Sequence, residues 1–503
     1  MPSSPSPSSS SGRLPVDGEK QAEDEAREAR HRNQDRQVPE RTRKDEETGG
    51  DGDSDGVTEA PENWQIPPEP DPLDTEADGV AGVVNRVLSR ISTRSSWNPG
   101  PPPDGGRVAW LMCFCAHLSV MNTWGFINSF GVFQSYYATT LGRPPSDISW
   151  IGSIQVFLTF FIGTFTGRVT DAGFFRPVML AGTAFMLLGI FATSAATSYW
   201  QLLLSQGLCM GLASGCIFCP AVSVLSTYFA RRRSLAIGIA ACGSVTGGLV
   251  FPAMARQLLP SAGFPWAVRA MGFVQLATLA FVNVFMRTRL PPRRTGGLVE
   301  WGALRELEFA FYCVGMFFNF WGVYFGFYYL AVFARTALTP PMSEVESLNL
   351  LLLLNGVGLV GRLVPNHVAD RTGPLTIMAP VCVAVGAALF AWVAVRTPAQ
   401  LYGWSAAYGI AAGAVQSLFP AGLSSLTTDL RRQGARMGLG FTIVSFAVLT
   451  GNPIAGAIIA ATGGRYEGAQ AFTGGCMLLG ACMMAAAKVA RMRRTGAGWS
   501  VKV

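Results

Sequence analysis

The feature that most constrains this chain is a series of twelve apolar runs that fills the sequence from Val108 onward. A helix needs roughly 20 mainly apolar residues to cross the hydrocarbon layer of a bilayer. Every backbone amide in lipid must find its partner within the spanning segment, so we predict that each run is a helix. The runs are 108–132, 147–167, 178–197, 200–228, 235–255, 267–286, 309–333, 348–368, 375–395, 399–425, 436–461 and 470–490.

The composition and the placement of charge agree with a membrane protein. Hydrophobic residues make up 49% of the chain and charged residues 14%. The first 104 residues hold 22 of the 32 acidic and 12 of the 39 basic side chains, a net charge of −10, and the remainder carries +17. The basic excess does not indicate nucleic-acid binding, because small groups of arginines are separated by long apolar runs. We therefore predict an all-α membrane protein with twelve transmembrane helices.

The region before the first run, residues 1–103, is rich in Ser, Pro, Gly and acidic residues. Such a composition buries too little apolar surface to fold alone, which predicts a disordered cytoplasmic tail. Its opening residues lack the apolar stretch of a signal peptide. Within the tail, residues 80–91 follow helical spacing, with Arg86, Arg90 and Arg94 on one stripe. This segment is either a short interfacial helix on anionic lipid or a linker with chance periodicity.

The loops predict the orientation and the division of the chain. With both termini inside, inner loops hold fourteen arginines near the span ends and outer loops six, which favours cytoplasmic termini. The turns after spans 2 and 8 are related, and so are the Arg clusters after spans 4 and 10. We expect two six-helix bundles, residues 104–286 and 309–490, joined by a cytoplasmic loop 287–308 and followed by a short tail 491–503.

Several motifs resemble the monocarboxylate transporter family of the major facilitator superfamily, and its fungal branch most closely. They are Pro103-Asp104-Gly105-Gly106 with Trp110, Ser129-Phe130-Gly131-Val132-Phe133, Tyr228 to Ala240, and Gly361-Arg362-Leu363-Val364-Pro365 with Ala369-Asp370-Arg371. The resemblance covers residues 103–490. It implies the major facilitator fold and transport by alternating access.

The resemblance also implies a cytoplasmic gate, in which Arg and Asp groups join the two halves in one state and release them in another. The matching positions are Asp171, Arg231, Arg232, Arg233, Asp370 and Arg371. The arginines are equally compatible with simple positive-inside anchoring. Ala172 follows Asp171 where the superfamily usually has Arg, which weakens the case for gating through that loop.

Inside the membrane the chain departs from family members that move lactate with a proton. Asn128 stands where they carry Lys, and Gly358 stands where they carry Asp, one turn before Arg362. No Asp or Glu lies in the middle of a predicted span. These differences disfavour a simple lactate–proton symporter.

Candidate residues for the substrate pathway follow from polar and aromatic side chains inside the spans. A buried Arg362 is costly unless it meets an anion, or unless it reaches water at the nearby end of its helix. His117 is a candidate proton carrier, although a hydrogen-bonded packing histidine is the simpler interpretation. The other candidates are the amides Asn122, Asn128 and Asn355, and the phenols Tyr324 and Tyr328, which share a helix face.

Catalysis, cofactors and metals are not indicated. All ten cysteines fall inside the runs, and we find no nucleophile–base pair, phosphate loop or metal-ligand cluster. The chain is therefore not expected to be an enzyme.

We expect a monomeric plasma-membrane transporter for a small organic acid or secondary metabolite, with export favoured and proton coupling left open. Its partners are the small-molecule substrate and the bilayer. An uptake permease for a nutrient or vitamin is one alternative. A nutrient sensor that keeps the fold without transporting is another, and deleting residues 1–95 would abolish signalling in a sensor but spare flux in a transporter.

Overall fold

The computed structural model describes residues 100–143, 145–293, 297, 299–496 and 498. The interfacial segment at 80–91 and residues 1–99 of the predicted tail lie outside the described residues. Every regular element within the described ranges is a helix. The fold class predicted from the apolar runs is therefore confirmed.

The first half of the described chain contains helices whose bounds follow the first six runs, with π-helical segments η1, η2 and η3 between α-helical ones. They are α3 (Gly106–Val120), η1 (Met121–Gly125), α4 (Phe126–Asn128), α5 (Phe130–Leu141), α6 (Pro145–Phe161), α7 (Gly163–Val169), η2 (Thr170–Phe174), α8 (Phe175–Ala195), α9 (Tyr199–Leu202), η3 (Leu203–Cys209), α10 (Met210–Ser226), α11 (Arg233–Ala241) and α12 (Gly243–Phe285).

The second half contains six long helices and two short 3-10 segments, η4 and η5. They are η4 (Trp301–Arg305), α13 (Leu307–Thr336), α14 (Glu344–Thr372), α15 (Pro374–Trp392), α16 (Pro398–Leu426), η5 (Leu430–Arg432), α17 (Gln433–Ala461) and α18 (Glu467–Thr495). The last helix continues five residues beyond the predicted end of its span at 490, to Thr495.

Nine helical stretches among the described residues are long and apolar enough to cross a membrane. Two of them, 49 and 53 residues long, each contain a turn made by a glycine with positive φ, Gly173 at 98° and Gly263 at 75°. A side chain would strain the backbone at such angles, whereas glycine adopts them readily. Counting each of these two stretches as two segments gives eleven membrane-spanning segments. Helix α16 lies where the sequence predicts the remaining one.

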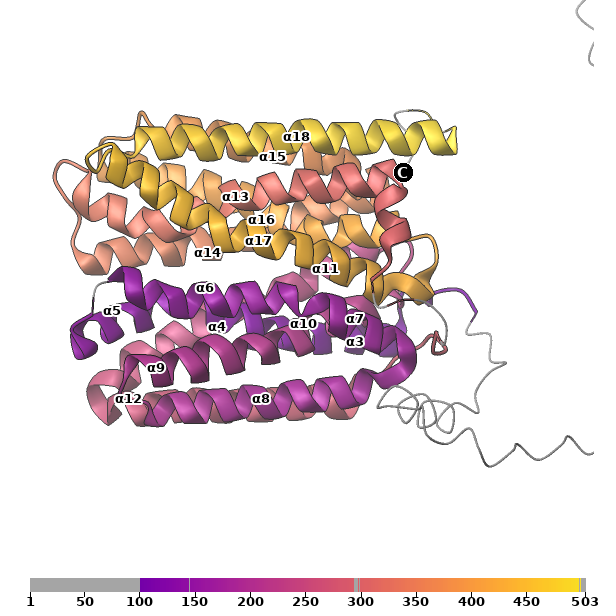
Figure 1. Ribbon diagram of the computed structural model, residues 1–503, viewed down its shortest axis with the longest axis horizontal. Helices are drawn as coiled ribbons and strands as arrows, with labels where there is room; N and C mark the ends of the chain where they lie inside the picture. Colours follow the sequence, from indigo (N-terminus) through magenta and orange to yellow (C-terminus); the bar gives the residue numbers. More distant parts are fainter. Residues whose placement is uncertain (1–99, 144, 294–296, 298, 497, 499–503) are drawn as a thin grey trace, which may run out of the picture. The chain divides into compact units, whose positions relative to one another are not determined.

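The two halves form two groups of helices that run side by side (Figure 1). Helices α3 to α12, except α11, occupy one side of the view, and α13 to α18 occupy the other. The described chain begins and ends at the same end of the bundle, which we call the terminal end.

Glycines bring the halves into close contact at the terminal end. Gly163 and Gly167 of α7 face Gly438 and Gly434 of α17, and a Cβ on either Gly167 or Gly434 would collide with the backbone carbonyl of the other. The hydroxyls of Thr164 and Thr442 lie 2.7 Å apart beside this contact. Small residues permit such an approach, since dispersion packing replaces the hydrophobic effect between helices in lipid.

A second contact of the same kind joins α11 to α14. A Cβ on Gly238 would lie 2.5 Å from the carbonyl oxygen of Arg362 and 3.0 Å from Cβ of Asn366. The two halves are thus packed backbone to backbone at two places.

The segment between the halves lies across the terminal end. The Arg293 amide donates to the carbonyl of Asp171 at 2.7 Å, and Pro292 contacts Gly173. The Arg293 side chain pairs with Glu300 at 3.6 Å, and Glu300 accepts from Arg432 of η5 at 2.8 Å. This segment is therefore attached to both halves.

Candidate functional site

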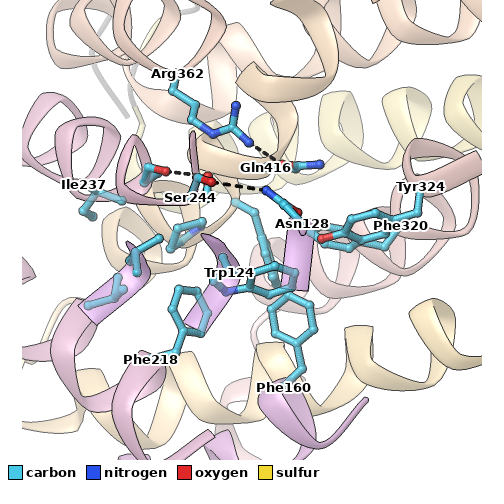
Figure 2. A pocket seen from close by; sticks show the side chains of 15 residues that line it. Trp124, Asn128, Phe160, Phe218, Ile237, Ser244, Phe320, Tyr324, Arg362 and Gln416 are labelled. Atoms are coloured by element: carbon cyan, nitrogen blue, oxygen red, sulfur yellow. Dashed lines mark hydrogen bonds between the residues drawn. The ribbon is translucent and has the colours of Figure 1, made fainter. Parts of the chain in front are cut away.

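A central pocket lies between the two halves and is lined by helices of both (Figure 2). Its volume is about 50 Å³, well below the roughly 300 Å³ of a typical ligand pocket. In this arrangement the pocket is too small for a bulky molecule. The lining residues are Val120, Trp124, Asn128, Phe160, Phe218, Val222, Ile237, Ala241, Ser244, Phe320, Tyr324, Arg362, Gln416, Phe419 and Pro420.

Arg362 of α14 is the cation of this pocket and is only 2% exposed. Its guanidinium donates to Oε1 of Gln416 on α16 at 2.8 Å, as Figure 2 shows. Within the described ranges, no carboxylate forms an ion pair with it. A buried guanidinium without a counter-ion carries a large desolvation cost, which a bound anion would offset. Arg362 does not reach water at the end of its helix.

Gly358 explains how the guanidinium is accommodated. A Cβ at Gly358 would lie 2.5 Å from Nη1 of Arg362, and one at Gly413 would lie 3.1 Å from the same atom. The guanidinium thus occupies the space that a side chain at position 358 would need. Proton-coupled family members carry Asp at this position, and here the guanidinium of Arg362 occupies the space of that side chain.

Aromatic rings enclose much of the remaining pocket. The rings of Trp124 and Tyr324, from opposite halves, are nearly parallel, at 5° with centroids 6.4 Å apart. Phe160 packs against Trp124 with centroids 5.0 Å apart. The Trp124 indole nitrogen is buried and has no hydrogen-bond partner in the described part of the chain. The pocket therefore offers flat apolar surfaces, an unused donor and a cation.

The π-helical segment η1 positions Trp124. Asn122 donates to the carbonyl of Leu118 at 2.7 Å, and Thr123 donates to the carbonyl of Ser119 at 2.9 Å. Side chains that bond to the preceding turn compete with regular helix bonding, and π-helical turns often occur at functional sites. Asn128 follows in α4, where its amide donates to the Ser244 carbonyl at 3.4 Å and lines the pocket.

Of the six predicted pathway residues, the structure brings Arg362, Asn128 and Tyr324 together in the central pocket. Asn122 instead donates to Thr278 at 2.9 Å and so joins the first span to the sixth. Asn355 bonds to Leu351 of its own helix at 2.9 Å. Tyr328, half-buried one turn beyond Tyr324, is also not among the lining residues.

His117 lies outside the central pocket and bonds through both ring nitrogens. Its Nδ1 lies 2.8 Å from the carbonyl oxygen of Ile239, and its Nε2 lies 3.1 Å from the hydroxyl of Thr246. A neutral ring that donates from Nδ1 and accepts at Nε2 satisfies both contacts. This geometry supports the packing interpretation of the histidine.

Replacing His117 with glutamine tests the proton-carrier role. We expect the transport rate to stay within about twofold, because only one of two modest hydrogen bonds is lost. The dependence of transport on pH should not change, since the ring exchanges no proton with substrate. Transport measured between pH 5 and 8 checks this, and a flattened profile in the His117→Gln variant would restore the proton-carrier role.

Two carboxylates at the terminal end each bond across to the opposite half. Asp171 of η2 accepts from the amides of Gly434 and Ala435 at 2.9 and 2.8 Å. Asp370 of α14 accepts from the amides of Ser234 and Leu235 at 2.8 and 3.0 Å. In both cases the amides belong to the first turn of a helix, where a negative charge is favoured. The turns after the predicted second and eighth spans thus make similar contacts.

The arginines predicted for the gate divide into two groups. Arg233 donates from Nη1 to the carbonyl of Ser424 in the other half at 3.3 Å. The side chains of Arg231, Arg232 and Arg371 are exposed. The Arg231 amide donates to Asp104 at 2.7 Å, a contact within the first half that fixes the turn before α11.

Gln416 and Trp124 are among the pocket residues that the sequence did not indicate. Gln416 is the partner of Arg362, and the need of a buried guanidinium for an acceptor on a facing helix is the signal that could have found it. Trp124 lies four residues before Asn128, on the same helix face, so its place beside that candidate was the available signal. The remaining lining residues are mainly aromatic or aliphatic and resemble ordinary core residues.

Comparison with known proteins gives consistent matches. Residues 109–427 match the family model of the Major Facilitator Superfamily. An MFS-type transporter of Gibberella zeae is 59% identical over 405 residues, covering 80% of this chain and 90% of the relative. The MFS-type transporter dbaD of Emericella nidulans is 38% identical over 358 residues, covering 71% and 80%. The aspyridones efflux protein apdF of the same fungus is 32% identical over 401 residues, covering 79% and 81%.

Solved structures share the fold. The fucose:proton symporter FucP of E. coli aligns with a TM-score of 0.60 at 14% identity, covering 75% of this chain and 97% of that one. The human organic anion transporter MFSD10 aligns with a TM-score of 0.59 at 18% identity, covering 75% and 99%.

Proposed function

The chain belongs to the major facilitator superfamily, and from this premise we propose that it exports a small organic acid with a flat, partly apolar body. The carrying observation is Arg362, a buried cation without an acidic counter-ion among the described residues, in a pocket lined from both halves. An anionic substrate would compensate this charge. The parallel rings of Trp124 and Tyr324 would hold its body.

The direction and setting of transport are part of this proposal. The relative apdF is described as an efflux protein, which supports export of a metabolite by this chain. We infer plasma-membrane placement, cytoplasmic termini and a monomeric transporter from the basic loops and the two-bundle fold. The monocarboxylate transporter family remains our subfamily proposal, because Gly361, Arg362 and Pro365 stand as in its motif.

Alternating access accounts for the contacts at the terminal end. The central pocket is closed off there by the glycine contacts and by the two capping carboxylates. Breaking these contacts would open a path from the terminal side, and re-forming them would accompany opening on the opposite side. The two arrangements form the bistable element that transport requires.

The direct test compares metabolites inside and outside cells that lack the protein with those in cells that express it. An exported organic acid should accumulate inside the deletion strain and fall in the medium, and the wild-type gene should restore both levels. If no anionic metabolite changes, the proposal is wrong.

Replacing Asp171 or Asp370 with asparagine tests the gate. A neutral amide caps the helix less strongly than a carboxylate, so we expect the closed terminal end to lose about fivefold in population. Cys219 reports the change, since its sulfur is buried 3.5 Å from the carbonyl of Gly163 beside the contact. Labelling of Cys219 by a maleimide should become faster by the same factor.

Asp429→Asn is the matched control for these variants. Asp429 lies at the same end and accepts from the Arg431 amide at 3.0 Å, within its own half. Its replacement should leave Cys219 labelling unchanged. Equal acceleration in all three variants would show that loss of negative charge, rather than of the contacts across the halves, is responsible.

A further inference from the structure

A second cavity lies at the terminal end, apart from the central pocket, with a volume of about 280 Å³. We call it the terminal cavity. Its walls come from η2 and α10 of the first half, from the connecting segment at Thr288 to Pro292, and from η5 and α17 of the second half. It shares no lining residue with the central pocket. In the described conformation it is the larger of these two cavities by more than fivefold.

The side chain of Gln433 indicates that this cavity takes a polar ligand. Its side chain is 1% exposed and lines the cavity, and neither atom of its amide group has a hydrogen-bond partner in the part of the chain that the structure describes. The hydroxyl of Thr170, another lining residue, is likewise buried without a partner there. Buried polar groups are costly unless they are hydrogen-bonded, so these groups indicate a polar occupant.

The charges of the lining favour an anion. Arg289 and Arg431 line the cavity together with one acid, Asp171, which gives a net charge of +1. Both oxygens of Asp171 already accept backbone amides of α17, so part of its charge is compensated. Gln433 is the first residue of α17, a 29-residue helix, and a helix N-terminus favours anions.

Arg289 is held in place by the backbone. Its Nε donates to the carbonyl of Thr227 at 3.2 Å, and its Nη1 donates to the carbonyls of Gly100 and Pro101 at 3.0 and 3.1 Å. Burial lowers the pKa of the Arg289 guanidinium, because the charged form loses contact with water. A bound anion would offset that loss.

The rest of the lining combines apolar residues, among them Leu290, Pro291 and Leu430, with the hydroxyl residues Ser223, Thr227 and Thr288. A bare inorganic ion would leave these surfaces uncovered. The occupant that fits is an anionic head joined to a short apolar body.

We propose that the terminal cavity binds a small organic anion and that the bound anion holds the terminal ends of the two halves together. The anion would contact Thr170 and Arg289 on one side and Arg431 and Gln433 on the other. It would thereby stabilise the closed terminal end and slow transport. This site is separate from the substrate pocket, and it would bind its anion whatever substrate the central pocket carries.

The test is calorimetric titration of the full chain in phosphatidylcholine nanodiscs with phenyl phosphate, and with benzyl alcohol as the uncharged control. Phenyl phosphate should bind saturably and slow maleimide labelling of Cys219, whereas benzyl alcohol should do neither. Arg431→Ala should weaken binding about tenfold, because it removes a charged contact. Absence of saturable binding to the wild-type chain would overturn the proposal.

Arg432→Ala is the matched control, because it removes the same charge from the neighbouring residue. Arg432 pairs with Glu300 and Asp429 and does not line the cavity. It should bind phenyl phosphate within about twofold of wild type, as expected for a site away from the change. Arg362→Gln should also bind normally. Equal losses in both Arg→Ala variants, or a loss confined to Arg362→Gln, would show that the probe binds elsewhere.

If Arg431→Ala does not fold, Gln433→Glu replaces it, because a second carboxylate in the cavity should repel the probe and abolish binding.

Nanodiscs containing phosphatidylserine distinguish the sources of the anion. A lipid headgroup that fills the cavity would lower the affinity of the wild-type chain for phenyl phosphate, and a ligand from solution would not.

Discussion

Arg362→Gln should reduce export of the organic acid by at least about tenfold, since a charged hydrogen bond to a desolvated anion is lost. A neutral amide replaces the one cation among the described residues that line the central pocket. The measurement is the rate at which the acid identified by the metabolite comparison leaves cells that express each variant. The amount of protein in the membrane should stay near wild type, because glutamine can still bond to Gln416.

Two companion variants separate charge from structure. Arg362→Lys keeps the charge but loses the planar guanidinium, for which Gly358 and Gly413 leave room, so its rate should fall between those of wild type and Arg362→Gln. Arg335→Gln changes an exposed arginine on α13 and should export normally. One result would contradict this role: Arg362→Lys exports as slowly as Arg362→Gln, and Arg362→Gln still binds the acid. The charge of Arg362 would then not act by binding the substrate.

Gly167→Val should stop transport by keeping the terminal end open. Its Cβ would collide with the carbonyl of Gly434, which is backbone and has no side-chain freedom to move aside. Overpacking of a tight contact costs about 1–3 kcal/mol, enough to lower the closed population by about tenfold or more. Faster maleimide labelling of Cys219, together with loss of export, would show the shift, and a Cys219→Ala background would identify the labelled thiol.

Gly475→Val is the control for helix propensity. Gly475 lies within α18, and a Cβ there meets no atom within 4 Å. The substitution introduces the same side chain into a membrane helix without touching the interface of the halves. If both variants lose export equally, the effect comes from helix stability and not from the contact between α7 and α17.

The sequence predicted the helices well because lipid leaves the backbone few alternatives. Each apolar run became a helix, since no other structure satisfies its amides without water. The π-helical segment at Met121–Gly125 was not predicted, because it arises where side chains such as Asn122 bond to the preceding turn. Such competition depends on local rotamers that a hydrophobic pattern does not reveal.

The candidate site was only partly predictable, for a related reason. Spacing places Tyr324 and Tyr328 on one helix face, but the depth of the pocket along that face decides which one lines it. The partner of Arg362 required knowing that α14 faces α16 in the register that places Gln416 opposite the guanidinium. Conversely, Gly358 was noticed as a departure from a family motif, and only the structure shows the steric role of the missing side chain.

The absence of a counter-ion for Arg362 within the described ranges has an energetic consequence for the transport cycle. A carrier loaded with a monovalent anion would be neutral at this position, whereas the empty carrier would hold an uncompensated positive charge within the electric field of the membrane. An elementary charge that crosses the whole field exchanges about 2.3 kcal/mol per 100 mV. With the cell interior negative, the voltage would draw the empty carrier back inward, so the resting potential itself could drive the expulsion of anions without a co-transported ion.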